Sequence, residues 1–81
     1  MTGTTAPRLD LRGLEPPEPM RRALEAIEAL CPGDTLEIFT DREPMLLQRE
    51  LGRRRHVFIS KLSVDGCLTS IRRSREESDG S

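Results

Sequence analysis

The most reactive side chains in this sequence are two thiols, Cys31 and Cys67. A thiolate can carry sulfur or change redox state, so either cysteine could serve a sulfur or redox carrier. The alternative is structural, because Cys31 continues the apolar face of an expected helix and Cys67 falls on the expected core face of a strand. Buried cysteines behave as small, inert hydrophobic residues. We favour this second interpretation, and two cysteines are too few for a disulfide scaffold.

The chain also contains one imidazole, His56, and two groups of arginines. No His or Cys lies near His56 at metal-ligand spacing, so we expect a solvated histidine at a strand edge and no metal site. The arginines are Arg53–Arg55, Arg72 and Arg73, which could bind phosphate or RNA, or could discourage strand addition at a sheet edge. The formal net charge of −1 favours the second role. We therefore expect neither nucleic acid nor a cofactor to bind.

Carboxylates cluster where two helices are expected to begin. They are Glu15, Glu18, Asp41 and Glu43. Both helices should start at the same end of the sheet, so their positive dipole ends should lie together beside these carboxylates. Capping and dipole compensation explain the four residues structurally. The functional alternative is an acidic corner that binds a basic partner or holds a hard cation such as Mg²⁺ or Ca²⁺.

Apolar spacing predicts the first two elements that position these groups. Residues 8–12 alternate strictly and predict a strand with Leu9 and Leu11 inward. A helix follows, with Pro19 in its first turn, and ends at the Pro-Gly pair at 32–33. Its apolar face comprises Met20, Ala23, Leu24, Ile27, Leu30 and Cys31.

A second strand and a short second helix follow. Residues 35–40 predict the strand, with Leu36 and Ile38 inward. Asp41 can cap the helix, which Gly52 closes. Its sheet-facing residues are Leu46, Leu47 and Leu51.

A hairpin ends the domain. Residues 56–64 and 67–73 predict two strands joined by a tight turn at Asp65-Gly66. This turn predicts that Val64 faces Cys67, Leu62 faces Thr69 and Ser60 faces Ile71. Alternation then places one set of side chains on the core face: Phe58, Leu62, Val64, Cys67, Thr69 and Ile71.

The order strand, helix, strand, helix, strand, strand predicts an α+β fold, a two-layer α/β sandwich with both helices on one face of a four-stranded sheet. The other face should stay uncovered. The strand phases place four large apolar side chains on it, Phe39, Val57, Ile59 and Leu68, among charged residues. Such a face is typical of an interaction surface. The alternatives are incidental exposure and cover by a folded-back tail.

Length and composition limit the organisation to one small domain. The chain has 81 residues, and residues 1–7 and 74–81 are polar, aperiodic and predicted to be disordered tails around a domain at 8–73. No apolar run approaches the ~20 residues of a membrane helix. The first residues lack the apolar stretch of a signal peptide, so we expect a cytoplasmic protein without membrane contact.

Three segments carry a resemblance to a known family. Residues 9–19, LDLRGLEPPEP, resemble the opening signature of the TusA/SirA sulfur-carrier superfamily. Residues 32–34, PGD, and residues 41–44, DREP, continue the likeness, which covers roughly residues 8–73. The sequence is most similar to a bacterial branch classified as a domain of unknown function. The resemblance implies a mixed sheet in the strand order 1-2-4-3.

One departure from that pattern bears on the chemistry. Sulfur carriers of this superfamily have Cys-Pro-x-Pro at the start of the first helix, where the cysteine carries the persulfide. Here Pro16 stands in place of that cysteine, and Glu15 and Glu18 flank it. Members of the branch often have His at the positions of Met20 and Arg42, and neither His is present.

These observations favour a non-enzymatic protein-interaction or accessory module that has lost the sulfur-carrier cysteine. Its candidate surfaces are the acidic corner and the open sheet face. One alternative is a sulfur or redox carrier that uses Cys31 or Cys67. Another, implied only by the resemblance, is a metal or haem accessory protein in nitrogen-oxide or respiratory metabolism. The sequence leaves the partner, the pathway and the oligomeric state open.

Overall fold

The structure, a computed structural model, describes residues 7–74 of the 81-residue chain. Two helices and four strands follow in the predicted order. They are β1 (Arg8–Asp10), α1 (Glu18–Glu28), β2 (Thr35–Thr40), α2 (Met45–Arg53), β3 (Val57–Ser63) and β4 (Gly66–Arg72). Apart from Pro7 and Ser74, the predicted tails lie outside the described residues.

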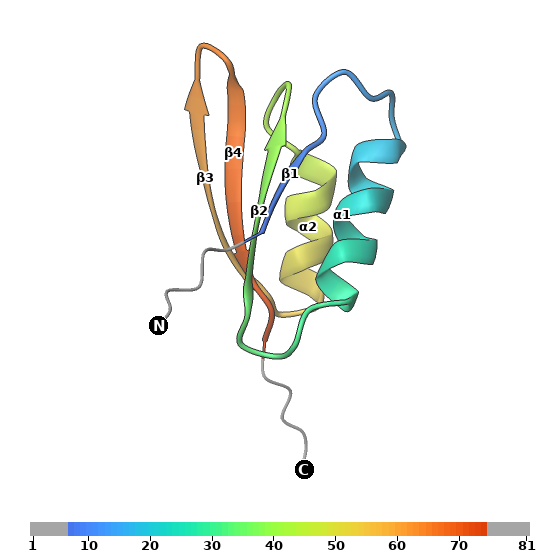
Figure 1. The fold of residues 1–81 in the computed structure, drawn as a ribbon, viewed down its shortest axis with the longest axis vertical. Helices are drawn as coiled ribbons and strands as arrows, with labels where there is room; N and C mark the ends of the chain where they lie inside the picture. The colour runs from blue at the N-terminus through green and yellow to red at the C-terminus, as the bar shows by residue number, and fades with distance from the viewer. Residues whose placement is uncertain (1–6, 75–81) are drawn as a thin grey trace.

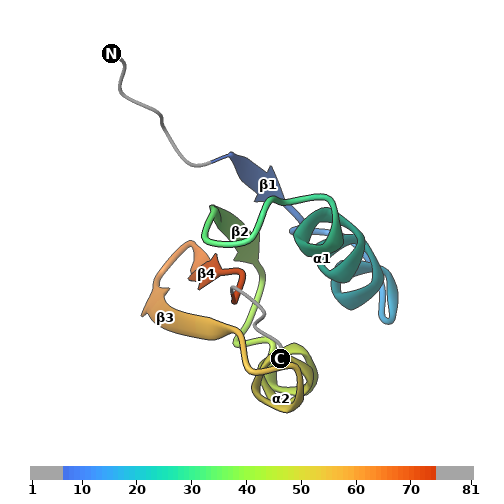
Figure 2. The same cartoon turned by 90° about the horizontal axis from the view of Figure 1, so that it is seen from below.

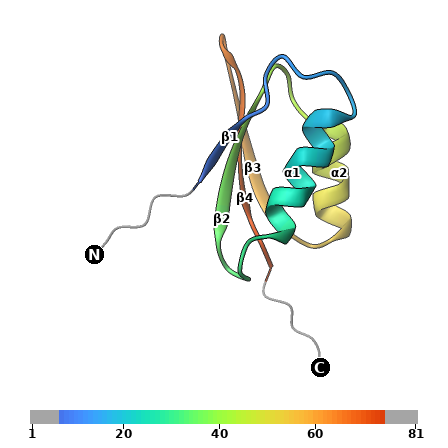
Figure 3. The same cartoon turned by 45° about the vertical axis from the view of Figure 1, so that its right-hand side comes forward.

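The strands form one mixed sheet in the order β1-β2-β4-β3. β1 pairs with β2 in parallel, whereas β4 is antiparallel to both of its neighbours. Both helices pack on the same face of the sheet, and the opposite face carries no helix (Figures 1, 2 and 3). The α+β two-layer sandwich predicted from the sequence is confirmed.

The core lies between the sheet and the two helices. Its buried hydrophobic residues are Leu11, Ala23, Ile27, Leu36, Ile38, Leu47, Leu51 and Ile71. The predicted inward residues of β2 are all in this set. β1 is shorter than predicted, but the backbone N–H of Leu11 still donates to the carbonyl of Phe39 at 2.7 Å, which continues the pairing beyond Asp10.

Helix α1 ends earlier than its apolar pattern suggests. Ala23 and Ile27 are buried, as predicted, but the helix stops at Glu28. The Arg73 guanidinium donates from Nη1 to the carbonyls that end the helix, those of Ile27 (3.3 Å), Glu28 (2.8 Å) and Leu30 (2.7 Å). Cys31 lies beyond this end and is exposed. The prediction that Cys31 belongs to the core was wrong, because α1 ends at Glu28 and its helical spacing does not continue to Cys31.

Helix α2 buries Leu47 and Leu51, as predicted, and runs one residue past Gly52. Leu46, also assigned to the sheet-facing side, is 68% exposed, and the neighbouring Met45 is 70% exposed. In a helix that presents Leu47 and Leu51 to the sheet, Leu46 is rotated by about 100° from Leu47, out of the buried stripe.

The structure contains the predicted hairpin of β3 and β4, but the pairing register differs by two residues from the predicted register. Ser63 faces Gly66, so the turn residues are Val64 and Asp65 rather than Asp65 and Gly66. The predicted pairs of Val64, Leu62 and Ser60 were therefore wrong, and each of the latter two faces a residue two positions earlier in β4. A shift of two keeps every side chain on its predicted face.

Gly66 explains this shift. It has a φ of +143°, which side-chain-bearing residues rarely adopt, and a Cβ at this position would lie 2.4 Å from the carbonyl oxygen of Thr40. The glycine therefore serves the close approach of β4 to the end of β2, instead of the turn itself.

The end of the hairpin extends beyond the helix layer (Figure 1). Leu62 is 69% exposed and Val64 is fully exposed, although both were predicted in the core. Leu62 lies on the helix side of the sheet and Val64 lies in the turn, and no helix reaches far enough to cover them. Cys67, further along the same face in β4, is buried as predicted.

Candidate functional site

A groove lies where the β1–α1 loop meets the β2–α2 loop and the start of α2. Its volume is about 650 Å³. The residues that line it are Leu11, Leu14, Pro16, Pro17, Pro19, Met20, Thr40, Asp41, Arg42, Glu43, Pro44, Met45, Leu46 and Leu47. Its walls are mostly apolar, and its polar side chains come almost entirely from the β2–α2 loop.

One hydrogen bond joins the two loops. Asp41 Oδ2 accepts from the backbone N–H of Gly13 at 2.7 Å. Gly13 has a φ of +82°, which lets the chain turn at this point after β1. Asp41 was predicted to cap α2, but the capping position is Pro44 and no side chain caps the helix. The carboxylate instead holds the loop that carries the prolines against the loop that carries Arg42.

The two apolar walls differ in character. The β1–α1 loop contributes Pro16, Pro17 and Pro19, which have no backbone N–H to offer a ligand. The Pro16–Pro17 peptide bond is cis. Opposite them, Met45 and Leu46 present flexible or branched apolar side chains that are more than two-thirds exposed. The sequence reasoning missed this wall, although two apolar residues directly after Pro44 and outside the buried stripe of α2 were a usable signal.

The four carboxylates of the predicted acidic corner divide into two pairs. Asp41 and Glu43 line the groove, and Glu15 and Glu18 do not. Glu43 accepts from Gln48 Nε2 at 3.2 Å. Within residues 7–74, no three His, Cys, Asp or Glu side chains are grouped to hold a metal ion.

Glu18 is engaged on α1 itself. Arg21 donates to both carboxylate oxygens, at 3.3 and 3.2 Å, and Arg22 donates to one of them at 3.1 Å. These hydrogen bonds, first those of Arg21 and then that of Arg22, lower the pKa of Glu18. The carboxylate lies in the first turn of the helix, where it also complements the dipole. The structure therefore gives Glu18 a local role, while Asp41 and Glu43 remain at the groove.

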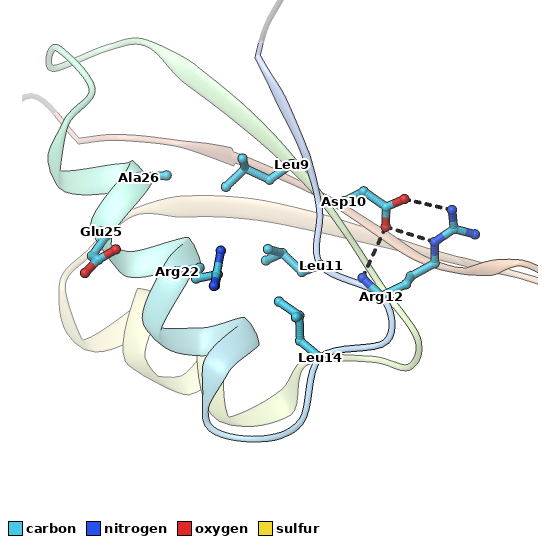
Figure 4. A pocket seen from close by; sticks show the side chains of 8 residues that line it. All are labelled: Leu9, Asp10, Leu11, Arg12, Leu14, Arg22, Glu25 and Ala26. Carbon is cyan, nitrogen blue, oxygen red and sulfur yellow. Dashed lines mark hydrogen bonds and ion pairs between the residues drawn. The ribbon is translucent and has the colours of Figure 1, made fainter.

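A smaller recess of about 460 Å³ lies between β1 and α1 (Figure 4). At its edge Arg12 donates to both carboxylate oxygens of Asp10, at 2.9 and 2.8 Å. These bonds lower the pKa of Asp10 to about 2. The Arg12 guanidinium also lies 4.3 Å from the centre of the Phe39 ring. The charged groups at this edge thus satisfy one another, which leaves little for a ligand to bind.

The open sheet face lies away from the helices, as predicted (Figure 3). Val57 and Ile59 on β3 are 56% and 64% exposed. Phe39 and Leu68, which face each other across β2 and β4, are only partly exposed, and Arg12 lies over the Phe39 ring. The exposed apolar surface on this face is therefore concentrated on the outer strand.

The thiols and the imidazole lie outside the groove. Cys67 is buried in the sheet, and Cys31 is exposed just beyond the end of α1. His56 is half-buried rather than solvated, and its Nδ1 accepts from the backbone N–H of Ser74 at 3.0 Å. None of the residues that line the groove is a cysteine or a histidine.

Fold and groove together define a small two-layer α+β domain with an apolar groove at the start of its helices and no thiol in that groove. The chain belongs to the family of uncharacterised conserved proteins designated DUF2249, whose family model matches residues 8–64. Neither the curated proteins nor the solved structures contain a match to the chain. In the part of the chain described by the structure, no helix is long and apolar enough to cross a membrane.

Proposed function

We propose that this domain is a non-catalytic protein-interaction module, and that its groove binds a short apolar segment of a partner protein flanked by basic residues. The observation that carries the proposal is the composition of the groove. Exposed apolar side chains line it, Asp41 and Glu43 add negative charge, and it contains no thiol or imidazole. A site of this kind can bind a ligand, and its two carboxylates already accept hydrogen bonds, Asp41 from the Gly13 N–H and Glu43 from Gln48.

The resemblance to sulfur carriers supports the loss of sulfur transfer. Pro16 stands where those carriers have their cysteine, and Pro16 lines the groove. The one hydroxyl in the lining, that of Thr40, is buried and donates to the Arg42 carbonyl at 2.7 Å. The position that carries the reaction in the carriers is thus apolar here, which fits a domain that has kept a binding site and lost its nucleophile.

The exposure of Met45 and Leu46 argues for a protein ligand. Burying each of these side chains would contribute about 1.5–3 kcal/mol through the hydrophobic effect. An apolar segment that covers both would therefore bind with useful affinity. Asp41 and Glu43 outnumber Arg42 among the charged residues of the lining, so flanking lysines or arginines favour binding over flanking acids.

A peptide-display selection tests the proposal and needs no candidate partner. Random peptides of about a dozen residues are selected on the wild-type domain, on Leu46→Glu, and on Val57→Glu as the matched control. Both positions are exposed, so a glutamate should be tolerated at each, and circular dichroism checks the fold. Only Leu46 lines the groove.

We expect peptides in which apolar residues alternate with or are flanked by Lys or Arg, retained by Val57→Glu and lost by Leu46→Glu. Failure to enrich any peptide would contradict the proposal. Binding that Val57→Glu abolishes and Leu46→Glu preserves would move the interaction to the open sheet face.

The cytoplasmic location expected from the sequence stays a prediction.

A second candidate, a sulfur or redox carrier, has one observation in its favour: Cys31 is exposed. Cys67 is fully buried and would need local unfolding to react. Treating the folded protein with polysulfide and measuring its intact mass tests this function. A persulfide that forms on the wild type, is absent from Cys31→Ser and passes to an acceptor thiol would support the carrier over the interaction module.

A further inference from the structure

The hydrogen bonds between the strands show which backbone groups of the outer strand, β3, point away from the sheet. The pattern starts at β1. The backbone N–H of Glu37 donates to the carbonyl of Pro7 at 2.9 Å, and that of Leu11 donates to Phe39 at 2.7 Å. Glu37 and Phe39 therefore direct their backbone polar groups towards β1. Because these groups alternate in direction along a strand, the residues between and beside them direct theirs towards β4.

The same alternation continues through β4 to β3. Thr69 faces Ile38 of β2, so its backbone groups point to β2, while those of Leu68 and Ser70 point to β3. Leu68 and Ser70 face Lys61 and Ile59, which therefore use their N–H and C=O groups within the hairpin. The remaining residues of β3 direct theirs outwards: Phe58, Ser60 and Leu62. Within residues 7–74, no other backbone group bonds to this edge.

This free edge has few of the devices that normally block strand addition. β3 pairs with β4 through seven consecutive residues without a bulge, contains no proline, and has one charged residue, Lys61. Both of its faces expose apolar side chains, with Ile59 (64%) on the open face and Leu62 (69%) on the helix side. An edge of this kind favours pairing with another strand.

We propose that β3 pairs with β3 of a second copy of this chain, antiparallel and centred on Ser60, to form one eight-stranded sheet. In this register the outward-pointing residues face one another, so that Phe58 lies opposite Leu62 of the second copy and Ser60 opposite Ser60. Six N–H···O bonds can then form across a two-fold axis. The groove takes no part, so the proposal is independent of the proposed function.

Self-complementarity identifies the second copy as the occupant. The exposed Leu62 of each chain comes beside the half-buried Phe58 of the other, which compensates for the helix layer that ends too early to cover Leu62. Lys61 comes opposite Ile59, which can pack against the aliphatic part of the lysine side chain.

The charges at the ends of the paired strands also complement one another. Asp65, in the hairpin turn, is the one acidic residue between 56 and 73, and the register brings it beside Arg55 of the second copy, just before β3. Within the described chain neither side chain forms a direct ion pair, although the charge of Asp65 also acts on Arg12. Two symmetric Asp65–Arg55 contacts would thus form without breaking an existing one.

Sedimentation equilibrium of the full chain tests the proposal. We expect the mean mass to rise from 9.2 kDa towards twice that value, with half-association between about 10 µM and 1 mM, as for a small, transient interface. Leu62→Pro removes an outward N–H that no described residue uses and should keep the chain monomeric. Leu62→Thr, which keeps the N–H, is the control and should still associate, and circular dichroism verifies both folds.

A charge reversal tests the register itself. Asp65→Arg places arginines beside Arg55 and should weaken association about tenfold, as expected for turning two exposed attractions into repulsions. Adding Arg55→Asp should restore it. A chain that stays monomeric to 1 mM, or a dimer insensitive to Leu62→Pro and to the charge reversal, would overturn the proposal. A monomer whose β3 edge instead binds an extended peptide of another protein would overturn the choice of a second copy.

Discussion

Replacing Gly66 by alanine tests the hairpin register more sharply than any other single change. The φ of +143° at this residue strains any side-chain-bearing replacement, at a cost of about 1–3 kcal/mol. The new Cβ would also lie 2.4 Å from the Thr40 carbonyl oxygen and 3.2 Å from Phe39 Cε1. Because the nearer atom belongs to the backbone, β4 and β2 must separate to accommodate it, which adds about 1–3 kcal/mol.

One effect of the substitution opposes this destabilisation. Alanine restricts the conformations of the unfolded chain more than glycine does, which stabilises the folded protein by about 0.4–1 kcal/mol. We therefore expect Gly66→Ala to lower the free energy of unfolding by about 3 kcal/mol, a large share of the 5–15 kcal/mol typical of a folded domain. For a chain of this size the melting temperature should fall by roughly 12–24 °C.

Two other glycines provide matched controls. Gly52 lies in α2, and a Cβ added there would meet nothing within 4 Å, so Gly52→Ala should raise stability by about 0.5–1 kcal/mol. Gly13 has a φ of +82° but equally open surroundings, so Gly13→Ala should cost only the strain, about 1–2 kcal/mol. The series separates strain from collision.

Thermal and urea unfolding followed by circular dichroism at 222 nm measures all three variants, because the chain contains no Trp or Tyr for intrinsic fluorescence. If Gly66→Ala lies within about 0.5 kcal/mol of the wild type, or costs no more than Gly13→Ala, the close approach of β4 to Thr40 is wrong. β4 would then have a register that does not bring Gly66 against the end of β2.

Three other sites give measurable expectations. An NMR titration should give Asp10 a pKa of about 2. The stability that the Asp10 carboxylate contributes to the fold is then complete above the ordinary pKa of 3.8 and is lost as the pH falls through about 2. In Arg12→Ala the pKa of Asp10 should return towards 3.8. In native protein a thiol reagent should label Cys31 rapidly and Cys67 only after unfolding, and equal rates would contradict the assigned burial. Arg73→Ala should lower the free energy of unfolding in urea by about 2 kcal/mol, because it removes the hydrogen bonds to the end of α1. Arg72→Ala, at the neighbouring exposed arginine, is the control and should cost much less.

The sequence predicted those parts of the fold that depend on period and order. Alternation located β2 to the residue, and the apolar spacing of α1 and α2 identified Ala23, Ile27, Leu47 and Leu51 as buried. Both signals report which face of one element is apolar. They do not report how far a neighbouring element extends, so the exposure of the hairpin end could not be predicted from them.

The errors share a physical origin in contacts between distant segments. Gly66 reads locally as a turn residue, and only its approach to Thr40 places it inside a strand. Asp41 reads locally as a helix cap, and only the position of the preceding loop lets it bind Gly13. His56 similarly reads as a solvated residue until the chain returns to it at Ser74.

The candidate site was predicted only in part. Asp41 and Glu43 were expected near the helix starts, and both line the groove, but they were expected in an acidic corner without an apolar floor. The floor and walls combine residues from two loops and two helices. Which side chains meet there depends on the crossing of those loops, and no spacing within one segment encodes it.

The most direct test of the central claim is to map where a ligand binds. The strongest peptide from the display selection is titrated into ¹⁵N-labelled protein while backbone amide shifts are recorded. We predict that the largest shifts fall on the non-proline residues of 14–20 and 41–47, the two segments that form the groove. Shifts concentrated on Val57, Ile59 and Leu68, with the groove unchanged, would contradict the account and assign binding to the open sheet face.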